Sequence, residues 1–149
     1  AWLRSQLNAM TSAGRLSGEQ RQSIRIRDIA DMVFSNLGLR MAEADRRHEL
    51  YREAQFVMGV PVSALYPEVG SEETVLIQGI IDAYFEENGE LILLDYKTDH
   101  VSKQDGADIL KKRYKRQLDD YQQALEQMLQ KKVRQKLIYS FTLKCWIEI

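Results

Sequence analysis

A two-residue turn, Asn88-Gly89, separates two strongly apolar stretches of the chain, residues 75–85 and 91–96. Asn-Gly between two such runs is the strongest short-range signal for a β-hairpin, because a type I′ turn needs positive φ at both central residues. We therefore expect two antiparallel strands, residues 73–86 and 90–97, joined by this tight turn.

The turn also sets which residues face one another across the hairpin. With a two-residue loop, Glu87 pairs with Glu90, and counting back along both strands places Asp82 directly across from Asp95. Lys97 lies two residues beyond Asp95 and therefore on the same face of the sheet. Two carboxylates and one ammonium group are thus predicted to meet where the hairpin opens.

Such a pair of acids is unfavourable for folding, because Cβ atoms of cross-strand neighbours lie roughly 4.5–5.5 Å apart and like charges there repel. The surrounding strands are apolar, so we expect Asp82 and Asp95 to be partly buried, and a buried anion pair needs a cation or a shared proton. Lys97 can neutralise one charge. The charge left over predicts a divalent metal with oxygen ligands, Mg²⁺ or Mn²⁺; a structural ion-pair cluster and a two-carboxylate glycosidase site are the alternatives.

At 149 residues and 44% apolar content, the chain is long enough for one hydrophobic core. We expect a single α/β domain over residues 1–149, with helices over 1–50 and a sheet core over 51–149 that includes a helix at 106–132. The central sheet is expected to be mixed and flanked by helices. Because the chain begins at Ala1 and not at Met, we interpret it as a piece of a longer polypeptide.

Apolar spacing predicts a helix at Trp2–Met10 and another from a capping box at Ser17 through Leu37, ended by Gly38. A short helix is expected at 39–47. The remaining expected elements are a first strand from near Arg52 to Pro61 and a last strand within 136–149.

Cys145 is the only cysteine, which excludes a disulfide framework, a cysteine-rich zinc site and an iron–sulfur cluster. No apolar run reaches the roughly 18–20 residues of a membrane span. We therefore expect no membrane partner and a cytoplasmic location.

Charge is segregated along the chain, although the net charge is only −1. Residues 61–96 contain eight acids and no Lys or Arg, whereas residues 111–136 contain nine basic residues and three acids. A basic segment beside an acidic site is typical of proteins that bind phosphates and coordinate metal together; a solvated helix face is the alternative. The candidate DNA-binding residues are Lys111, Lys112, Arg113, Lys115 and Arg116.

Gly79-Ile80-Ile81-Asp82, followed after twelve residues by Asp95-Tyr96-Lys97-Thr98, resembles the core signature of the PD-(D/E)XK nuclease superfamily. Residues 52–56 resemble the Arg-Glu-x-x-Phe segment that opens the first core strand of its RecB-type members. Residues 117–121 match their Gln-x-x-x-Tyr helix motif. The resemblance runs from about Arg15 to the end of the chain, and the ordered set is far more specific than any single motif.

The resemblance implies a restriction-endonuclease-like core and metal-dependent hydrolysis of DNA phosphodiester bonds. Asp82 and Asp95 would be ligands of Mg²⁺ or Mn²⁺, with the backbone carbonyl of Tyr96 as a third ligand. Lys97 would orient or activate the attacking water. The resemblance adds three supporting catalytic-site residues: Gln117, Tyr121 and Glu53.

The family setting implies an exonuclease-type domain of an ATP-dependent helicase/nuclease, acting in double-strand break processing and recombinational repair in the bacterial cytoplasm. Its partners would be DNA and a second helicase/nuclease subunit of the AddB/RexB type. The chain has no Gly-x-x-x-x-Gly-Lys-Ser/Thr loop, so the motor is expected in another part of that polypeptide.

One departure concerns histidine, because RecB-type sites recruit a His from an early helix. This chain has only His48, too close to Glu53, and His100, which follows the catalytic strand. We therefore expect the missing His upstream of Ala1 and weak activity of the isolated chain. Two rival functions fit the same motifs: a non-catalytic DNA- or partner-binding module with a degenerate site, and a stand-alone restriction enzyme or junction resolvase.

Overall fold

The computed structural model describes residues 2–149. Two compact units form along the chain, one ending at Leu39 and the other spanning Arg40–Ile149. Whether the two act as one nuclease domain stays a prediction. The first unit is helical, as expected; its helices are α1 (Trp2–Ser12), α2 (Gly18–Ser23), α3 (Ile26–Val33) and the start of α4 (Asn36–Arg46).

The predicted capping box is present at the start of α2, where Ser17 and Gln20 exchange side-chain and backbone hydrogen bonds. The expectation of one continuous helix from there to Leu37 is wrong, because Ile24 adopts an extended conformation and ends α2. Apolar spacing survives such a break, so periodicity alone did not reveal it.

Gly38 does not end a helix, as the sequence had suggested, but lies inside α4. The Ser35 hydroxyl accepts a hydrogen bond from the Gly38 N–H and so caps a new helix at this point. A Cβ at Gly38 would lie 2.3 Å from the carbonyl oxygen of Val33, so only glycine permits this close approach.

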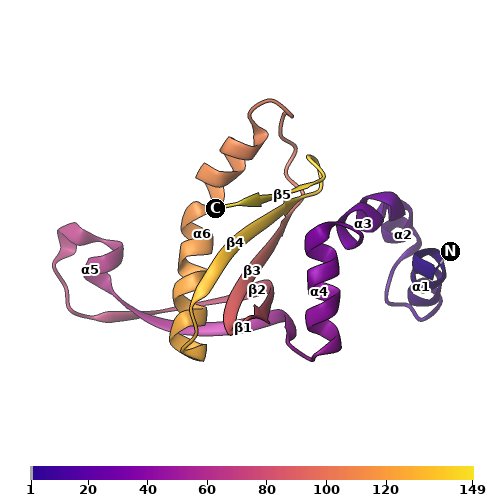
Figure 1. The fold of residues 1–149 in the computed structure, drawn as a ribbon. Coiled ribbons are helices and arrows are strands. Elements are labelled where there is room, and N and C mark those ends of the chain that lie inside the picture. The colour runs from indigo at the N-terminus through magenta and orange to yellow at the C-terminus, as the bar shows by residue number, and fades with distance from the viewer. Residues whose placement is uncertain (1) are drawn as a thin grey trace. The chain divides into compact units, whose positions relative to one another are not determined.

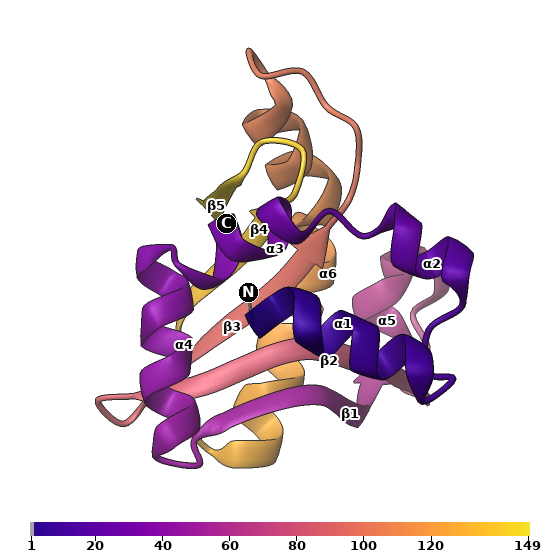
Figure 2. The same ribbon diagram turned by 90° about the vertical axis from the view of Figure 1, so that its right-hand side faces the viewer.

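The second unit is built on a mixed five-stranded sheet with the order β1-β2-β3-β4-β5, shown with its helices in Figure 1 and Figure 2. The β3–β4 pair is parallel and the other pairs are antiparallel, which confirms the predicted mixed sheet and α/β class. The strands are β1 (Leu50–Pro61), β2 (Thr74–Glu87), β3 (Glu90–Lys97), β4 (Val133–Ser140) and β5 (Cys145–Glu148), and the other elements are α5 (Val62–Leu65), the 3₁₀ turn η1 (Pro67–Val69) and α6 (Gly106–Leu129).

The C-terminal stretch contains two strands, which corrects the expectation of a single strand within 136–149. The chain reverses after Ser140 through a turn in which Lys144 has a φ of 56°. β5 then pairs antiparallel to β4.

The core of the second unit lies between the sheet and α6, which runs alongside it (Figure 1). Burying these large apolar side chains contributes about 1.5–3 kcal/mol each, so the docking of α6 on the sheet is the main stabilising contact of the unit. The core residues are Phe56, Met58, Val60, Ile81, Tyr84, Leu91, Leu93, Leu118, Ala124, Leu125, Val133 and Ile138. None of the described helices is long and apolar enough to cross a membrane.

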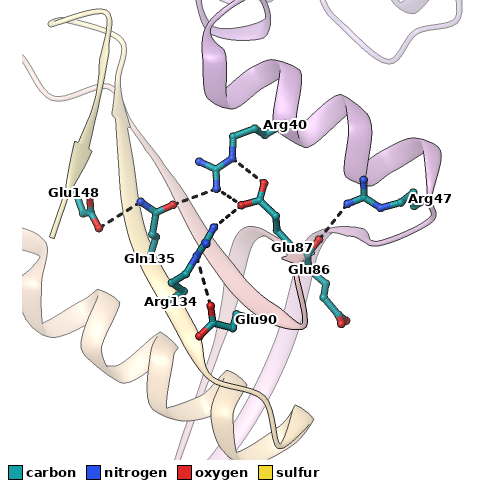
Figure 3. A network of polar contacts seen from close by, with 8 residues as sticks. All are labelled: Arg40, Arg47, Glu86, Glu87, Glu90, Arg134, Gln135 and Glu148. Atoms are coloured by element: carbon teal, nitrogen blue, oxygen red, sulfur yellow. Dashed lines mark hydrogen bonds and ion pairs between the residues drawn. The ribbon is translucent and has the colours of Figure 1, made fainter.

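A polar network holds the turn end of the hairpin (Figure 3). The Glu87 carboxylate accepts hydrogen bonds from Arg40 at 2.9 and 2.7 Å and from Arg134 of β4. Arg40 also donates to Gln135 at 3.1 Å and lies over the Phe85 ring. The network therefore ties α4, β2 and β4 together at the end of β3 remote from Asp95.

Candidate active site

The hairpin register predicted from the Asn88-Gly89 turn is confirmed. Asn88 and Gly89 have φ values of 55° and 80°, the positive values that a type I′ turn requires. The pairs run from Glu87 with Glu90 down to Ala83 with Leu94. The next residue on each strand is one of the two predicted acids.

Asp82 and Asp95 lie just beyond the last of these backbone pairs. In place of another ladder bond, Oδ2 of Asp82 accepts a hydrogen bond of 2.8 Å from the backbone N–H of Tyr96. The Asp82 carboxylate is therefore held against β3, beside Asp95. It is close enough that its negative charge raises the pKa of Asp95.

Asp95 is the most buried of the candidate site residues, at 2% exposure. Burial raises the pKa of its carboxyl, the charge of Asp82 adds to the rise, and the Lys97 ammonium opposes it. Nζ of Lys97 lies 2.6 Å from Oδ2 of Asp95 in an ion pair. The predicted group of two acids and one lysine is thus gathered on one face of the sheet, and one ammonium faces two carboxylates.

Helix α6 brings Gln117 and Tyr121 to the same group. Lys97 donates a hydrogen bond of 3.0 Å to Oε1 of Gln117, and Nε2 of Gln117 donates one of 2.8 Å to the Tyr121 hydroxyl. The two residues stand four apart and so share one helical face. Burial raises the pKa of Tyr121, the hydrogen bond from Gln117 opposes this, and the charges of Asp95 and Asp82 add to it. The Tyr121 phenol therefore lies in the field of both carboxylates.

Glu53 lies on β1 at the register position opposite Asp82, where the β1–β2 ladder is interrupted on both strands. Its φ of 51° is unusual for a residue other than glycine. The side chain is exposed and makes no hydrogen bond or ion pair with residues 2–149. The structure thus places Glu53 next to the site along the backbone but does not bring its carboxylate into contact with the other groups.

The five candidate DNA-binding residues all lie on the first half of α6, exposed to solvent. Two of them are in ion pairs, Arg113 with Asp99 at 2.5 Å and Lys115 with Asp119 at 2.7 Å. The other three form no ion pair within the described part of the chain: Lys111, Lys112 and Arg116.

Two contacts of the site were not anticipated from the sequence. The Tyr114 ring lies under the Lys97 ammonium, and the Tyr114 hydroxyl bonds to the carboxylate of Asp99. The sequence placed Tyr114 only in the apolar stripe of α6. Its spacing of three residues from Gln117 is the signal that could have put it on the site's face.

The donor set suits a hard divalent cation, because it offers two carboxylates and a backbone carbonyl with net negative charge after pairing with Lys97. Three or more His, Cys, Asp or Glu side chains do not gather into such a site anywhere in residues 2–149. A cation here would therefore take water and phosphate oxygens as its remaining ligands.

Comparison with known proteins agrees with this geometry. Residues 3–145 match the family described as the PD-(D/E)XK nuclease superfamily. The AddA-type chain of the ATP-dependent helicase/nuclease of Clostridium kluyveri is 38% identical over 144 residues, which cover 94% of this chain and 11% of the relative. The proteins of the same name from Bacillus pumilus (39% identical, 91% of this chain, 11% of the relative) and Pediococcus pentosaceus (40%, 85% and 10%) are similar. The chain spans about a tenth of the length of these curated relatives.

Proposed function

Because the chain belongs to the PD-(D/E)XK nuclease superfamily, we propose that it hydrolyses DNA phosphodiester bonds with the help of a divalent cation. The observation that carries the proposal is the buried Asp95 carboxylate, which has Lys97 at 2.6 Å and Asp82 beside it. A purely structural ion-pair cluster leaves one negative charge of this group without a partner, whereas a metal-dependent site uses it.

Asp82 and Asp95 would hold the cation, Mg²⁺ or Mn²⁺. Tyr96 supports this assignment, because its N–H points toward Asp82 and the N–H and C=O of one extended residue face the same neighbouring strand. Its carbonyl oxygen is therefore directed to the Asp82 side as a third donor. When bound, such a cation lowers the pKa of a coordinated water and stabilises charge on the phosphate oxygens.

Lys97 would place a fixed positive charge where negative charge grows on the scissile phosphate, and would orient the attacking water. Such preorganised charge is usually the largest single contribution to catalysis of this kind. Gln117 keeps the ammonium in place by accepting its hydrogen bond, and Tyr121 in turn receives a hydrogen bond from Gln117. Glu53 is proposed as an indirect contributor from the neighbouring strand.

The exposed basic residues of α6 would hold the DNA backbone. Lys111, Lys112 and Arg116 are free to neutralise phosphates, an interaction that carries little sequence preference. Arg113 and Lys115 could join them by exchanging their present carboxylate partners for phosphate.

The relatives named above carry a helicase and a nuclease in their names. By analogy, we propose that this chain is the exonuclease-type domain of such a polypeptide in the bacterial cytoplasm. The whole protein would process double-strand breaks for recombinational repair, together with a second subunit of the AddB/RexB type.

The test is cleavage of linear DNA by the complete polypeptide that contains this chain, with Mg²⁺, with chelator, and after Mg²⁺ is restored. Cleavage should disappear with chelator and return with the metal, and Lys97→Ala should abolish it under all conditions. Binding of DNA without cleavage in every sample would instead identify a non-catalytic binding module.

A further inference from the structure

The ammonium group of Lys97 has a third neighbour besides Asp95 and Gln117. Nζ lies 4.1 Å from the centroid of the Tyr114 ring. A lysine ammonium within about 6 Å of an aromatic ring is attracted by the negative face of its π-system. Lys97 is thus held by a carboxylate, an amide oxygen and a ring.

The Tyr114 ring is itself held firmly. Its hydroxyl donates to the carboxylate of Asp99, 2.9 Å from each of the two oxygens. Arg113 reaches the same carboxylate at 2.5 Å, and the Thr142 hydroxyl donates to the Asp99 backbone carbonyl at 2.7 Å. Asp99 follows Lys97 by two residues, so this contact fastens the end of β3 to the face of α6 that carries Tyr114.

A neutral support for Lys97 matters because Asp95 cannot serve two purposes equally well. Under the proposed function, Asp95 is a metal ligand, and a cation bound to its carboxylate weakens its attraction for the ammonium. The long lysine side chain then has several rotamers to choose from. Tyr114 and Gln117 carry no charge, so their hold on the ammonium does not depend on the state of Asp95.

We propose that Tyr114, oriented by Asp99, is a positioning residue that keeps the Lys97 ammonium over the scissile phosphate. The inference rests on the proposed nuclease function and adds to it a residue that none of the family motifs above contains. Tyr114 acts through Lys97 and needs no contact with DNA.

The kinetic test compares two variants in the complete polypeptide. Tyr114→Leu removes the ring but keeps apolar bulk, and should lower kcat about tenfold with KM within about twofold, the size expected for a partly desolvated cation–π contact. Tyr114→Phe keeps the ring and loses only the bond to Asp99, and should stay within about threefold of wild type. Tyr66→Leu, the same change at an exposed tyrosine of the α5–η1 segment, is the matched control and should leave kcat unchanged.

A spectroscopic test needs no cleavage. In this chain labelled with ¹³C at the lysine ε position, the ε-methylene protons of Lys97 should be shifted upfield by the ring, and the signal is assigned by its loss in Lys97→Arg. The shift should persist in Tyr114→Phe and vanish in Tyr114→Leu.

The two tests separate the inference from the proposed function. A wild-type polypeptide that does not cleave DNA contradicts the nuclease function, whatever the lysine spectrum shows. An active wild type with equal kcat for Tyr114→Leu, or with Tyr114→Phe as slow as Tyr114→Leu, overturns the positioning role alone. An unshifted Lys97 signal in the wild-type chain also overturns it.

Discussion

The backbone N–H of Tyr96 donates to Oδ2 of Asp82, which takes the place of a backbone acceptor just where the β2–β3 ladder ends. The carboxylate thus has two tasks, closing the ladder and, as proposed, holding the metal. Asparagine keeps an acceptor oxygen and alanine does not, so the two substitutions separate these tasks.

We predict that Asp82→Asn changes the free energy of unfolding by less than about 0.5 kcal/mol, whereas Asp82→Ala loses about 1–2 kcal/mol by leaving a partly buried N–H without a partner. Both variants should lose DNA cleavage. Urea unfolding of the two variants measures the first effect. Equal stability of the two variants would show that the bond to Tyr96 contributes nothing to the fold.

Glu53 provides a test of backbone strain beside the site. A left-handed conformation costs a residue with a Cβ about 1–2 kcal/mol, so Glu53→Gly should be more stable than Glu53→Ala by about 1 kcal/mol. The comparison is made by thermal or urea unfolding of the two variants.

The carboxylate of Glu53 is tested separately with Glu53→Gln. We expect cleavage to fall about tenfold if its charge supports the site, as proposed. Unchanged cleavage would remove Glu53 from the site and leave it as a surface acid.

The parts of the structure that could be predicted are those set by local chemistry. The Asn88-Gly89 turn determined the register of β2 and β3, and that register alone gathered Asp82, Asp95 and Lys97. No tertiary information was needed, because one turn type fits this dipeptide and side chains alternate strictly along a strand.

The parts that could not be predicted depend on contacts between distant segments. Positive φ at Glu53 is uncommon for its residue type, so nothing in its identity announces the interruption of the ladder. The position of Tyr114 under Lys97 depends on how α6 docks on the sheet, whereas spacing shows only which helical face the ring occupies.

The exposed lysines of α6 should contribute through the salt dependence of DNA binding. Changing both Lys111 and Lys112 to Gln should weaken binding and reduce the slope of log K against log salt by about 1–2, since each phosphate contact contributes about 0.9. The same double change at Lys131 and Lys132, just past the other end of α6, is the matched control. An equal loss in both double variants would mean that net charge alone, and not this part of the helix, binds DNA.

Glu87 should make the fold sensitive to acid. Its hydrogen bond with Arg40 holds the pKa of the carboxyl below its ordinary value, burial opposes this, and Arg134 reinforces it. A lowered pKa stabilises the fold above the ordinary carboxyl pKa, and the stabilisation is lost as pH falls through the folded-state value. Glu87→Gln should therefore cost about 1 kcal/mol at pH 7 and nothing at pH 2–3, in urea unfolding measured across that range. A cost that is the same at both ends would assign the effect to packing.

Asp95 should show the opposite dependence, because burial raises the pKa of its carboxyl. An acid with a raised pKa lowers stability as pH rises through the interval between its ordinary and its folded-state pKa. Asp95→Asn should therefore be at least as stable as wild type above that interval, and gain nothing below it. A residue kept at such a cost is expected to serve catalysis.

The most direct measurement is therefore made on Asp95→Asn alone, with the melting temperature at pH 8 and cleavage of linear DNA in Mg²⁺ recorded on the same preparation. We predict a melting temperature no lower than that of wild type and a loss of cleavage of about 10³-fold or more. A lower melting temperature together with cleavage near the wild-type rate would contradict the proposed role, because Asp95 would then serve the fold and not the chemistry.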